Sequence, residues 1–368
     1  MRCYEAHPNE AERTAIRRPL RMGGTILTLL SIAILSLITT TLLIEEASGQ
    51  LRSRQSFRER IKTAISLSQP TPETQQDASS ELDADSSSKE TNVNQKSGST
   101  VRVLRDEIYQ DTEGRSGRCD VFLPAPQLSD KSLPVVILVH GGGWVSGDKW
   151  NLKGYAHQLA EKGFAAITIN YRHAPKHPFP KQVDDVRQAM LWTVKQEERF
   201  QLDLNRVGMF GYSAGGHLTA LVASLANESR STQTEASEWS EKDPRWQELP
   251  KIQAICIGGP PCNFELLPPN NTSMAFFLGD SRKNAPDIYR AASPLAHVSA
   301  GDPPTCIIHG ESDIMVPLKS SQRFHQAQIA VGVKSELIVL PKQGHMLAFL
   351  NPKTADEMVR HFQKELEQ

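Results

Sequence analysis

The stretch Gly211-Tyr-Ser-Ala-Gly215 constrains the fold of this chain more than any other feature of its sequence. An apolar run from Val207 to Phe210 precedes it, and apolar residues recur at helical spacing over 218–225. A turn this tight between a strand and a helix needs a glycine on each side of the serine. The pattern therefore predicts a nucleophile elbow that exposes Ser213 at a helix N-terminus, where free N–H groups favour negative charge.

Strand-like and helical patterns alternate from residue 101 onward. This alternation predicts an α/β fold with a mostly parallel sheet that helices cover on both faces. The first two predicted strands form an antiparallel pair, and the continuous apolar run over 134–140 is typical of a strand buried on both faces. The predicted strands are 101–110, 118–123, 134–140, 164–170, 207–210, 252–257, 305–309 and 336–340. The predicted helices are 151–162, 181–196, the one that follows Ser213, 317–331 and 352–367.

Two segments interrupt the alternation. Residues 228–249 are polar and acidic and contain Trp239 and Trp246, so we expect surface decoration, with stacking on sugar rings as the alternative. Residues 260–297 follow the sixth strand, where a lid over the active site would be inserted. Because this second segment is short, we expect an open pocket.

Length and charge bound the class of protein and its partners. A chain of 368 residues allows one large α/β domain and an additional tail. Its 41 basic and 42 acidic residues give a net charge of −1, so no basic field points to a nucleic-acid partner. We predict a basic N-terminal region over 1–24, an apolar segment over 25–44, a disordered polar linker over 45–100 and the folded catalytic domain over 101–368.

The apolar segment 25–44 runs for about 20 residues without a charge, which is long enough to cross a bilayer as a helix. Two interpretations stay open: an uncleaved transmembrane signal anchor, or the apolar part of a signal peptide cleaved after Ala47-Ser48-Gly49. Both predict that the downstream chain is exported, either membrane-anchored or secreted. We expect membrane contact only through an uncleaved segment.

The five cysteines show no Cys-x-x-Cys spacing, which argues against a disulfide framework. Cys256 and Cys306 fall inside apolar strand patterns, where cysteine most often behaves as a small buried hydrophobe. A single bridge that involves Cys256 or Cys262 stays open for an exported domain. His173 and His177 lie in a proline-rich stretch without a third ligand, so we predict no metal site.

A serine hydroxyl becomes a good nucleophile only when a base takes its proton and a carboxylate orients that base. In this kind of sheet each group follows a strand, in the order serine, acid, histidine. His345 follows the last predicted strand, and Asp313 follows the strand before it. We therefore predict Ser213, Asp313 and His345 as catalytic residues, with Glu311 and Asp302 as alternative acids.

A developing oxyanion needs preorganised hydrogen-bond donors. The stretch His140-Gly-Gly-Gly-Trp144 follows the third predicted strand, where a side chain would block the approach of a carbonyl oxygen. The predicted donors are the backbone amides of Gly142, Gly143 and Ala214, with Gly141 as a substitute. We predict that Trp144 binds substrate by lining the acyl pocket, the alternative being that it simply packs.

Four motifs together resemble the esterase/lipase branch of the α/β-hydrolases. They are His140-Gly-Gly-Gly-Trp-Val-Ser-Gly-Asp-Lys149, Asn170-Tyr-Arg172, Gly211-Tyr-Ser-Ala-Gly-Gly-His217 and His309-Gly-x-x-Asp313. The groups most similar to them are hormone-sensitive-lipase-like carboxylesterases and the feruloyl/acetyl-xylan esterase type of polysaccharide deacylases. The resemblance covers about 101–368 and implies an eight-stranded, mostly parallel sheet with a small lid insertion.

The resemblance implies a serine carboxylic-ester hydrolase that forms an acyl-enzyme on Ser213 without a metal or organic cofactor. The expected substrates are short acyl esters or acyl-decorated polysaccharide. One alternative is an arylformamidase-like amidase, which uses the same machinery on an N-formyl bond. A second is a non-catalytic binding module that kept the fold. The sequence carries no signal for an oligomeric state.

Overall fold

A computed structural model of the chain describes residues 100–125 and 132–367. The predicted regions 1–24 and 25–44, and the linker 45–100 up to residue 99, lie outside the described residues. In the part of the chain that is described, no helix is both long enough and apolar enough to cross a membrane.

Eight strands form one sheet in the order β1-β2-β4-β3-β5-β6-β7-β8. The pairs β1–β2 and β2–β4 are antiparallel, and every other neighbouring pair is parallel. The mostly parallel sheet predicted from the alternation is therefore confirmed. The strands are β1 (Val101–Ile108), β2 (Arg118–Pro124), β3 (Leu133–Val139), β4 (Ala165–Ile169), β5 (Leu202–Tyr212), β6 (Ile252–Gly258), β7 (Thr305–Gly310) and β8 (Ser335–Leu340).

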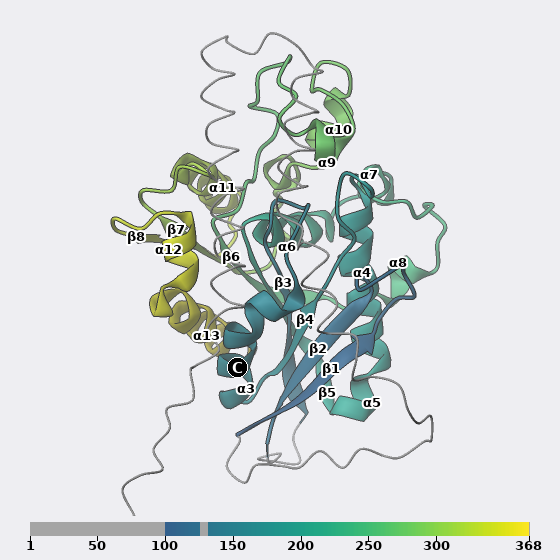
Figure 1. The fold of residues 1–368 in the computed structure, drawn as a ribbon, viewed down its shortest axis with the longest axis vertical. Coiled ribbons are helices and arrows are strands. Elements are labelled where there is room, and N and C mark those ends of the chain that lie inside the picture. The colour runs from purple at the N-terminus through teal and green to yellow at the C-terminus, as the bar shows by residue number, and fades with distance from the viewer. Residues whose placement is uncertain (1–99, 126–131, 368) are drawn as a thin grey trace, which may run out of the picture. The chain divides into compact units, whose positions relative to one another are not determined.

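Helices cover both faces of the sheet (Figure 1). One apolar cluster joins the sheet to α4 (Lys181–Lys195), α6 (Ala214–Leu225) and α11 (Leu318–Ala330). A second cluster joins the opposite face to α3 (Lys153–Glu161), α12 (His345–Leu350) and α13 (Pro352–Leu366). Side chains of β3 alternate between the two clusters, Val135, Ile137 and Val139 in the first and Val136 and Leu138 in the second. This alternation explains the continuous apolar run of the sequence, because a strand covered on both faces has no polar side.

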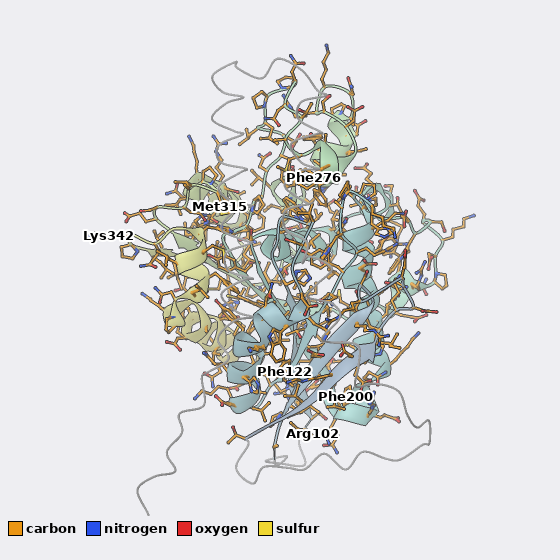
Figure 2. All side chains as sticks on the ribbon, in the orientation of Figure 1. Arg102, Phe122, Phe200, Phe276, Met315 and Lys342 are labelled. Atoms are coloured by element: carbon orange, nitrogen blue, oxygen red, sulfur yellow. The ribbon has the colours of Figure 1, made fainter. Side chains whose placement is uncertain are left out.

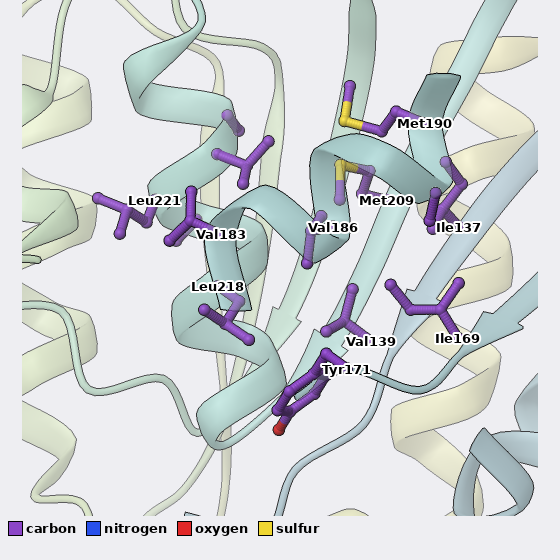
Figure 3. Close-up of a cluster of buried hydrophobic side chains, with 14 of the residues drawn as sticks. Ile137, Val139, Ile169, Tyr171, Val183, Val186, Met190, Met209, Leu218 and Leu221 are labelled. Atoms are coloured by element: carbon purple, nitrogen blue, oxygen red, sulfur yellow. The ribbon is translucent and has the colours of Figure 1, made fainter. Parts of the chain in front are cut away.

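The first cluster fixes the helix that carries the elbow. Figure 3 shows α4 and α6 facing the strands β3, β4 and β5 through branched and sulfur-containing side chains. The labelled residues are Ile137, Val139, Ile169, Tyr171, Val183, Val186, Met190, Met209, Leu218 and Leu221. Every one of them is buried, so burial on this scale stabilises α6 by roughly 1.5–3 kcal/mol per large side chain.

Several short elements were not predicted, because one or two helical turns leave no readable periodicity. They are η4 (Lys149–Leu152), α5 (Glu197–Phe200), α7 (Arg230–Glu235), α8 (Arg245–Glu248), α9 (Ala275–Leu278), α10 (Pro286–Ala291), η5 (Pro294–His297) and α12. Strand β5 also begins at Leu202, before the apolar run, and only Leu202 is buried among its first five residues, so this part of the strand carries no apolar pattern.

The segment 228–249 packs against the domain and does not present aromatic faces to solvent. Trp239 and Trp246 meet edge to face at 4.9 Å and form a small buried cluster with Leu191 of α4. The guanidinium groups of Arg245 and Arg187 lie over Trp239 and Trp246 respectively. Stacking of these rings on a sugar is therefore blocked in this arrangement.

The segment 260–297 contains α9, α10 and η5. Figure 1 shows α9 and α10 together, beyond the upper ends of the strands. The backbone of this segment is tied down at its base, where Ser320 of α11 donates to the carbonyl of Pro260 at 3.0 Å and accepts from the amide of Cys262 at 2.8 Å.

The described cysteines are free and buried. Cys256 and Cys306 are register partners on the parallel strands β6 and β7, as expected of residues in apolar strand patterns. Burial raises the pKa of the Cys256 thiol, so it behaves as a packed apolar group.

Candidate active site

Strand β5 and helix α6 meet at Ser213 in the predicted elbow. Ser213 has φ 56° and ψ −121°, a conformation that residues with a Cβ rarely adopt. A Cβ on Gly211 would lie 2.2 Å from the carbonyl oxygen of Gly215, and one on Gly215 would lie 2.0 Å from that of Val139. Only glycine fits at these two positions, and Ser213 stays half-buried between fully buried neighbours. The turn thus presents the serine side chain toward solvent.

The predicted acid and base are in contact. The Nδ1 atom of His345 lies 2.5 Å from Oδ2 of Asp313, and both side chains are buried. A carboxylate can only accept, so Nδ1 carries the proton and Nε2 of the neutral ring is left with a free lone pair. This is the tautomer that a general base needs.

The backbone brings the serine and the histidine to the same place. The amide of Ser213 donates to the carbonyl of Gly258 at 2.7 Å. A Cβ on the next residue, Gly259, would lie 2.9 Å from Cε1 of His345. Ser213 and the imidazole therefore contact consecutive residues at the end of β6. Tyr212 adds a second link, because its ring centroid lies 5.3 Å from that of His345.

Burial would raise the pKa of Asp313, but hydrogen bonds from His309 and His345 outweigh it and hold that pKa well below its usual range. The two alternative acids lie elsewhere. Oε2 of Glu311 accepts from the amide of Lys342, and Oδ1 of Asp302 accepts from the hydroxyl of Ser299. Asp313 is the candidate acid that meets His345.

The glycine loop after β3 packs directly against the elbow. A Cβ on Gly141 would lie 2.8 Å from the carbonyl of Tyr212 and 3.2 Å from Cβ of Ser213. The carbonyl of Gly142 turns inward and accepts from the amides of Val145 and Ser146. Among the described residues, the amides of the predicted donors Gly142, Gly143 and Ala214 donate to no backbone carbonyl. These N–H groups are thus available beside Ser213.

A buried polar network anchors the far end of this loop. The amide of Lys149 donates to Oδ1 of Asn170 at 2.6 Å, and its ammonium group lies 2.5 Å from Oδ1 of Asp120. The side-chain amide of Asn170 also donates to Asp148 at 3.2 Å. Because such a buried charge pair is satisfied in only one geometry, it fixes the loop.

The structure places Trp144 in the core under the lid segment. Its indole ring stacks on Phe277 with centroids 4.4 Å apart, and its Nε1 donates to Nδ1 of His217 at 3.2 Å. Nε2 of His217 then donates to the carbonyl of Ala292 at 2.7 Å. The Trp144 side chain therefore joins the glycine loop after β3 to the segment 260–297. His217 is fully buried and is an internal structural group.

Exposed apolar side chains flank the acid and the base. Ile314 and Met315 follow Asp313 directly and are 81% and 47% exposed, and Leu347, two residues after His345, is 59% exposed. Figure 2 shows Met315 toward the same end of the molecule as Phe276 of α9. Apolar groups that reach solvent beside these side chains offer an apolar surface that a bound molecule can contact.

Sequence reasoning missed three contributors to this site: Tyr212, Gly259 and His309. Tyr212 and His309 lie inside motifs that were recognised, but nothing in a linear pattern shows what their side chains touch. Gly259 directly follows a strand, as the other site residues do, and that position is the one signal that could have drawn attention to it.

The strand order and the elbow after β5 define an α/β-hydrolase. The BD-FAE family model matches residues 119–328, which is more than half of the chain, and the chain belongs to this family. Solved structures share the fold. A truncated carbohydrate esterase from gut microbiota superposes with a TM-score of 0.63 at 20% identity, covering 73% of this chain and 97% of the other. Esterase B from Lactobacillus rhamnosis superposes with a TM-score of 0.60 at 23% identity, covering 73% of this chain and 87% of the other.

Several curated relatives are named esterases or ester hydrolases. Esterase LipC of Mycobacterium tuberculosis is 32% identical over 231 residues, which are 58% of this chain and 53% of LipC. The chain spans about half the length of the curated relatives it matches.

Proposed function

We propose that this protein hydrolyses carboxylic esters through an acyl-enzyme on Ser213. The observation that carries the proposal is the 2.5 Å contact between His345 and Asp313, beside a serine held at positive φ. Family membership and the esterase names of the curated relatives support the same reaction class.

The proposed reaction runs through two acyl transfers. Oγ of Ser213 attacks the ester carbonyl carbon while Nε2 of His345 takes the hydroxyl proton. The amides of Gly142, Gly143 and Ala214 stabilise the oxyanion, and Asp313 stabilises the imidazolium. The C–O bond then breaks, and the alcohol leaves with the proton from His345. Water attacks the acyl-serine by the same route, which releases the acid and restores the hydroxyl.

For the substrate we propose short acyl esters or acyl groups carried on a polysaccharide. The exposed apolar side chains beside Asp313 and His345 suit a small apolar acyl or alcohol group. The similar solved structure that is named a carbohydrate esterase supports a sugar-borne ester.

The reaction class is tested by Ser213→Ala in the full chain. Hydrolysis of p-nitrophenyl acetate should fall to near background, because removal of the nucleophile leaves at most about 10³–10⁴-fold catalysis over water. Ser240→Ala, at an exposed serine of the 228–249 segment, is the matched control and should keep wild-type turnover. Covalent labelling by a fluorophosphonate should be lost only in Ser213→Ala. A folded wild-type protein that does not label would instead favour a binding module.

The substrate class is tested by parallel assays on acetylated xylan, a feruloyl ester, p-nitrophenyl esters of increasing acyl length and N-formylkynurenine. We expect the highest kcat/KM on short acyl esters or on acetylated xylan. Preference for N-formylkynurenine would assign the arylformamidase-like alternative.

We also propose that the catalytic domain is exported and is tethered by residues 25–44 if that segment stays uncleaved. The support is the uncharged run of about 20 residues, which matches the thickness of a bilayer. The mass of the mature protein in membrane and soluble fractions tests this. A full-length chain confined to the cytosol would contradict export.

A further inference from the structure

A second histidine contacts the carboxylate of Asp313. His309, the next-to-last residue of β7, is completely buried, and its Nε2 lies 3.3 Å from Oδ2 of Asp313 and 2.9 Å from the carbonyl oxygen of Val316. Oδ2 is the same oxygen that accepts from His345. Two imidazole rings therefore meet at one buried carboxylate oxygen.

The hydrogen-bond partners of His309 define which nitrogen carries its proton. Nε2 faces a carbonyl and a carboxylate, both of which can only accept, so Nε2 is protonated. Nδ1 lies 2.7 Å from Oγ of Ser321, in the first turn of α11. In the neutral ring, Nδ1 accepts the Ser321 hydroxyl proton, and this bond holds the ring with Nε2–H toward Asp313. Ser321 is itself fully buried, so the pair is rigid.

The two oxygens of Asp313 are held in different ways. Oδ1 accepts from the amides of Met315 and Val316, each at 2.9 Å. Oδ2 is held by side chains alone, those of His345 and His309. During turnover the bond from His345 must stay aligned while the imidazole gains and loses a proton. His309 is then the contact to Oδ2 that does not change in the reaction.

We propose that His309, oriented by Ser321, is a positioning residue that keeps Oδ2 of Asp313 directed at Nδ1 of His345. The proposal rests on the ester-hydrolase function above, since it assigns His309 a part in that reaction. The ionisable side chains that face Asp313 are His309 from β7, His345 from α12 and Tyr212 from β5. None of the three is a carboxylate, and the side chains that contact the single negative charge at Oδ2 are the two histidines.

The test compares amide replacements that keep different nitrogen positions. His309→Gln places a side-chain amide where Nε2 lies and can still donate to Asp313, whereas His309→Asn places it near Nδ1 and cannot. The matched control is His325→Asn on α11, because Nδ1 of His325 also bonds a serine hydroxyl, that of Ser335 at 2.9 Å, but away from Asp313. All variants are made in the full chain and assayed beside wild type and Ser213→Ala.

We expect His309→Asn to lower kcat by about 10–100-fold, with KM unchanged within about twofold, because misplacement of a catalytic group by about 1 Å costs up to this much. His309→Gln should restore most of kcat, and His325→Asn should match wild type. The strongly downfield proton resonance of the His345–Asp313 hydrogen bond should persist in His309→Gln and vanish in His309→Asn. A purely structural histidine would not separate Gln from Asn in this way.

Wild-type kcat in folded His309→Asn would overturn the proposal, as would equal losses in His309→Asn, His309→Gln and His325→Asn. If His309→Asn does not fold, Ser321→Ala decides: a lowered kcat at an unchanged Tm supports the proposal, and an unchanged kcat refutes it. A wild-type protein without activity on any ester would refute the proposed function. In that case the NMR resonance still reports whether His309 positions the pair.

Discussion

The hydroxyl of Tyr212 donates a hydrogen bond to the backbone carbonyl of His345 at 2.7 Å. Tyr212 directly precedes Ser213, so this bond links the two loops that carry the proposed nucleophile and the proposed base. Tyr212 is buried, and this burial, more than the nearby charge of Asp313, raises the pKa of its hydroxyl. The phenol therefore stays protonated and remains a donor.

Tyr212→Phe should lower both activity and stability modestly. The ring is kept, but one buried hydrogen bond worth about 1 kcal/mol is lost and the carbonyl of His345 is left without its donor. We expect a several-fold loss of kcat together with this loss in the free energy of unfolding, measured by urea titration. Tyr289→Phe removes a comparable bond to the carbonyl of Asp280 and is the control, with the stability loss but an unchanged kcat. Equal kcat losses in both variants would contradict a specific link.

Gly141→Ala should nearly abolish activity. Its Cβ would lie 2.8 Å from the carbonyl of Tyr212 and 3.2 Å from Cβ of Ser213, so the loop must move away from the nucleophile. Loss of aligned oxyanion donors costs about 10²–10³-fold in kcat. Gly154→Ala in α3 meets no atom within 4 Å and should keep full activity, with a gain of about 0.5–1 kcal/mol in stability. Wild-type kcat in Gly141→Ala would exclude this loop from the site.

His217 should make the fold sensitive to acid. Burial lowers its pKa to about 4 from an ordinary value near 6.5. The unfolded chain therefore binds the proton more tightly, and stability that is complete above pH 6.5 is lost as the pH falls toward 4. This loss amounts to about 3 kcal/mol. His217→Gln keeps a donor for Ala292 but does not titrate, so its free energy of unfolding should fall less between pH 7 and pH 4. If the free energy of unfolding falls equally with pH in wild type and in His217→Gln, His217 is not the source of the acid sensitivity.

Asp302 should change the free energy of unfolding with pH in the opposite direction to His217. Burial raises its pKa to about 6, and its Oδ2 atom is buried without a hydrogen-bond partner. The folded state binds this proton more tightly, so the ionised carboxyl destabilises the fold above pH 6. This penalty fades as the pH falls toward 3.8, the ordinary pKa of the group. Asp302→Asn should raise the free energy of unfolding at pH 8 by up to about 3 kcal/mol and change it little at pH 4. Urea titrations of both proteins at the two pH values measure this difference. An equal effect of Asp302→Asn at both pH values would show that the titration of Asp302 is not its cause.

Local patterns in the sequence were sufficient to predict the strands of the sheet, the elbow and the glycine loop. A strand followed by Gly211-Tyr-Ser-Ala-Gly215 admits one geometry, since a Cβ at either glycine would overlap backbone atoms. The position of His345 after the last strand likewise follows from the order of the elements. These features depend on residues that are neighbours in the chain, and that is why the sequence determines them by itself.

Tertiary structure alone decided which side chains meet. Asp302 precedes β7 whereas Glu311 and Asp313 follow it, and only the packing of β7 against β8 brings Asp313 to His345. His309 contacts the same carboxylate from four residues earlier in the chain, through the turn that follows β7. Trp144 turns into the core because Phe277, far along the chain, offers it a stacking face. Contacts of this kind depend on distances between segments far apart in the chain, which propensity and spacing do not encode.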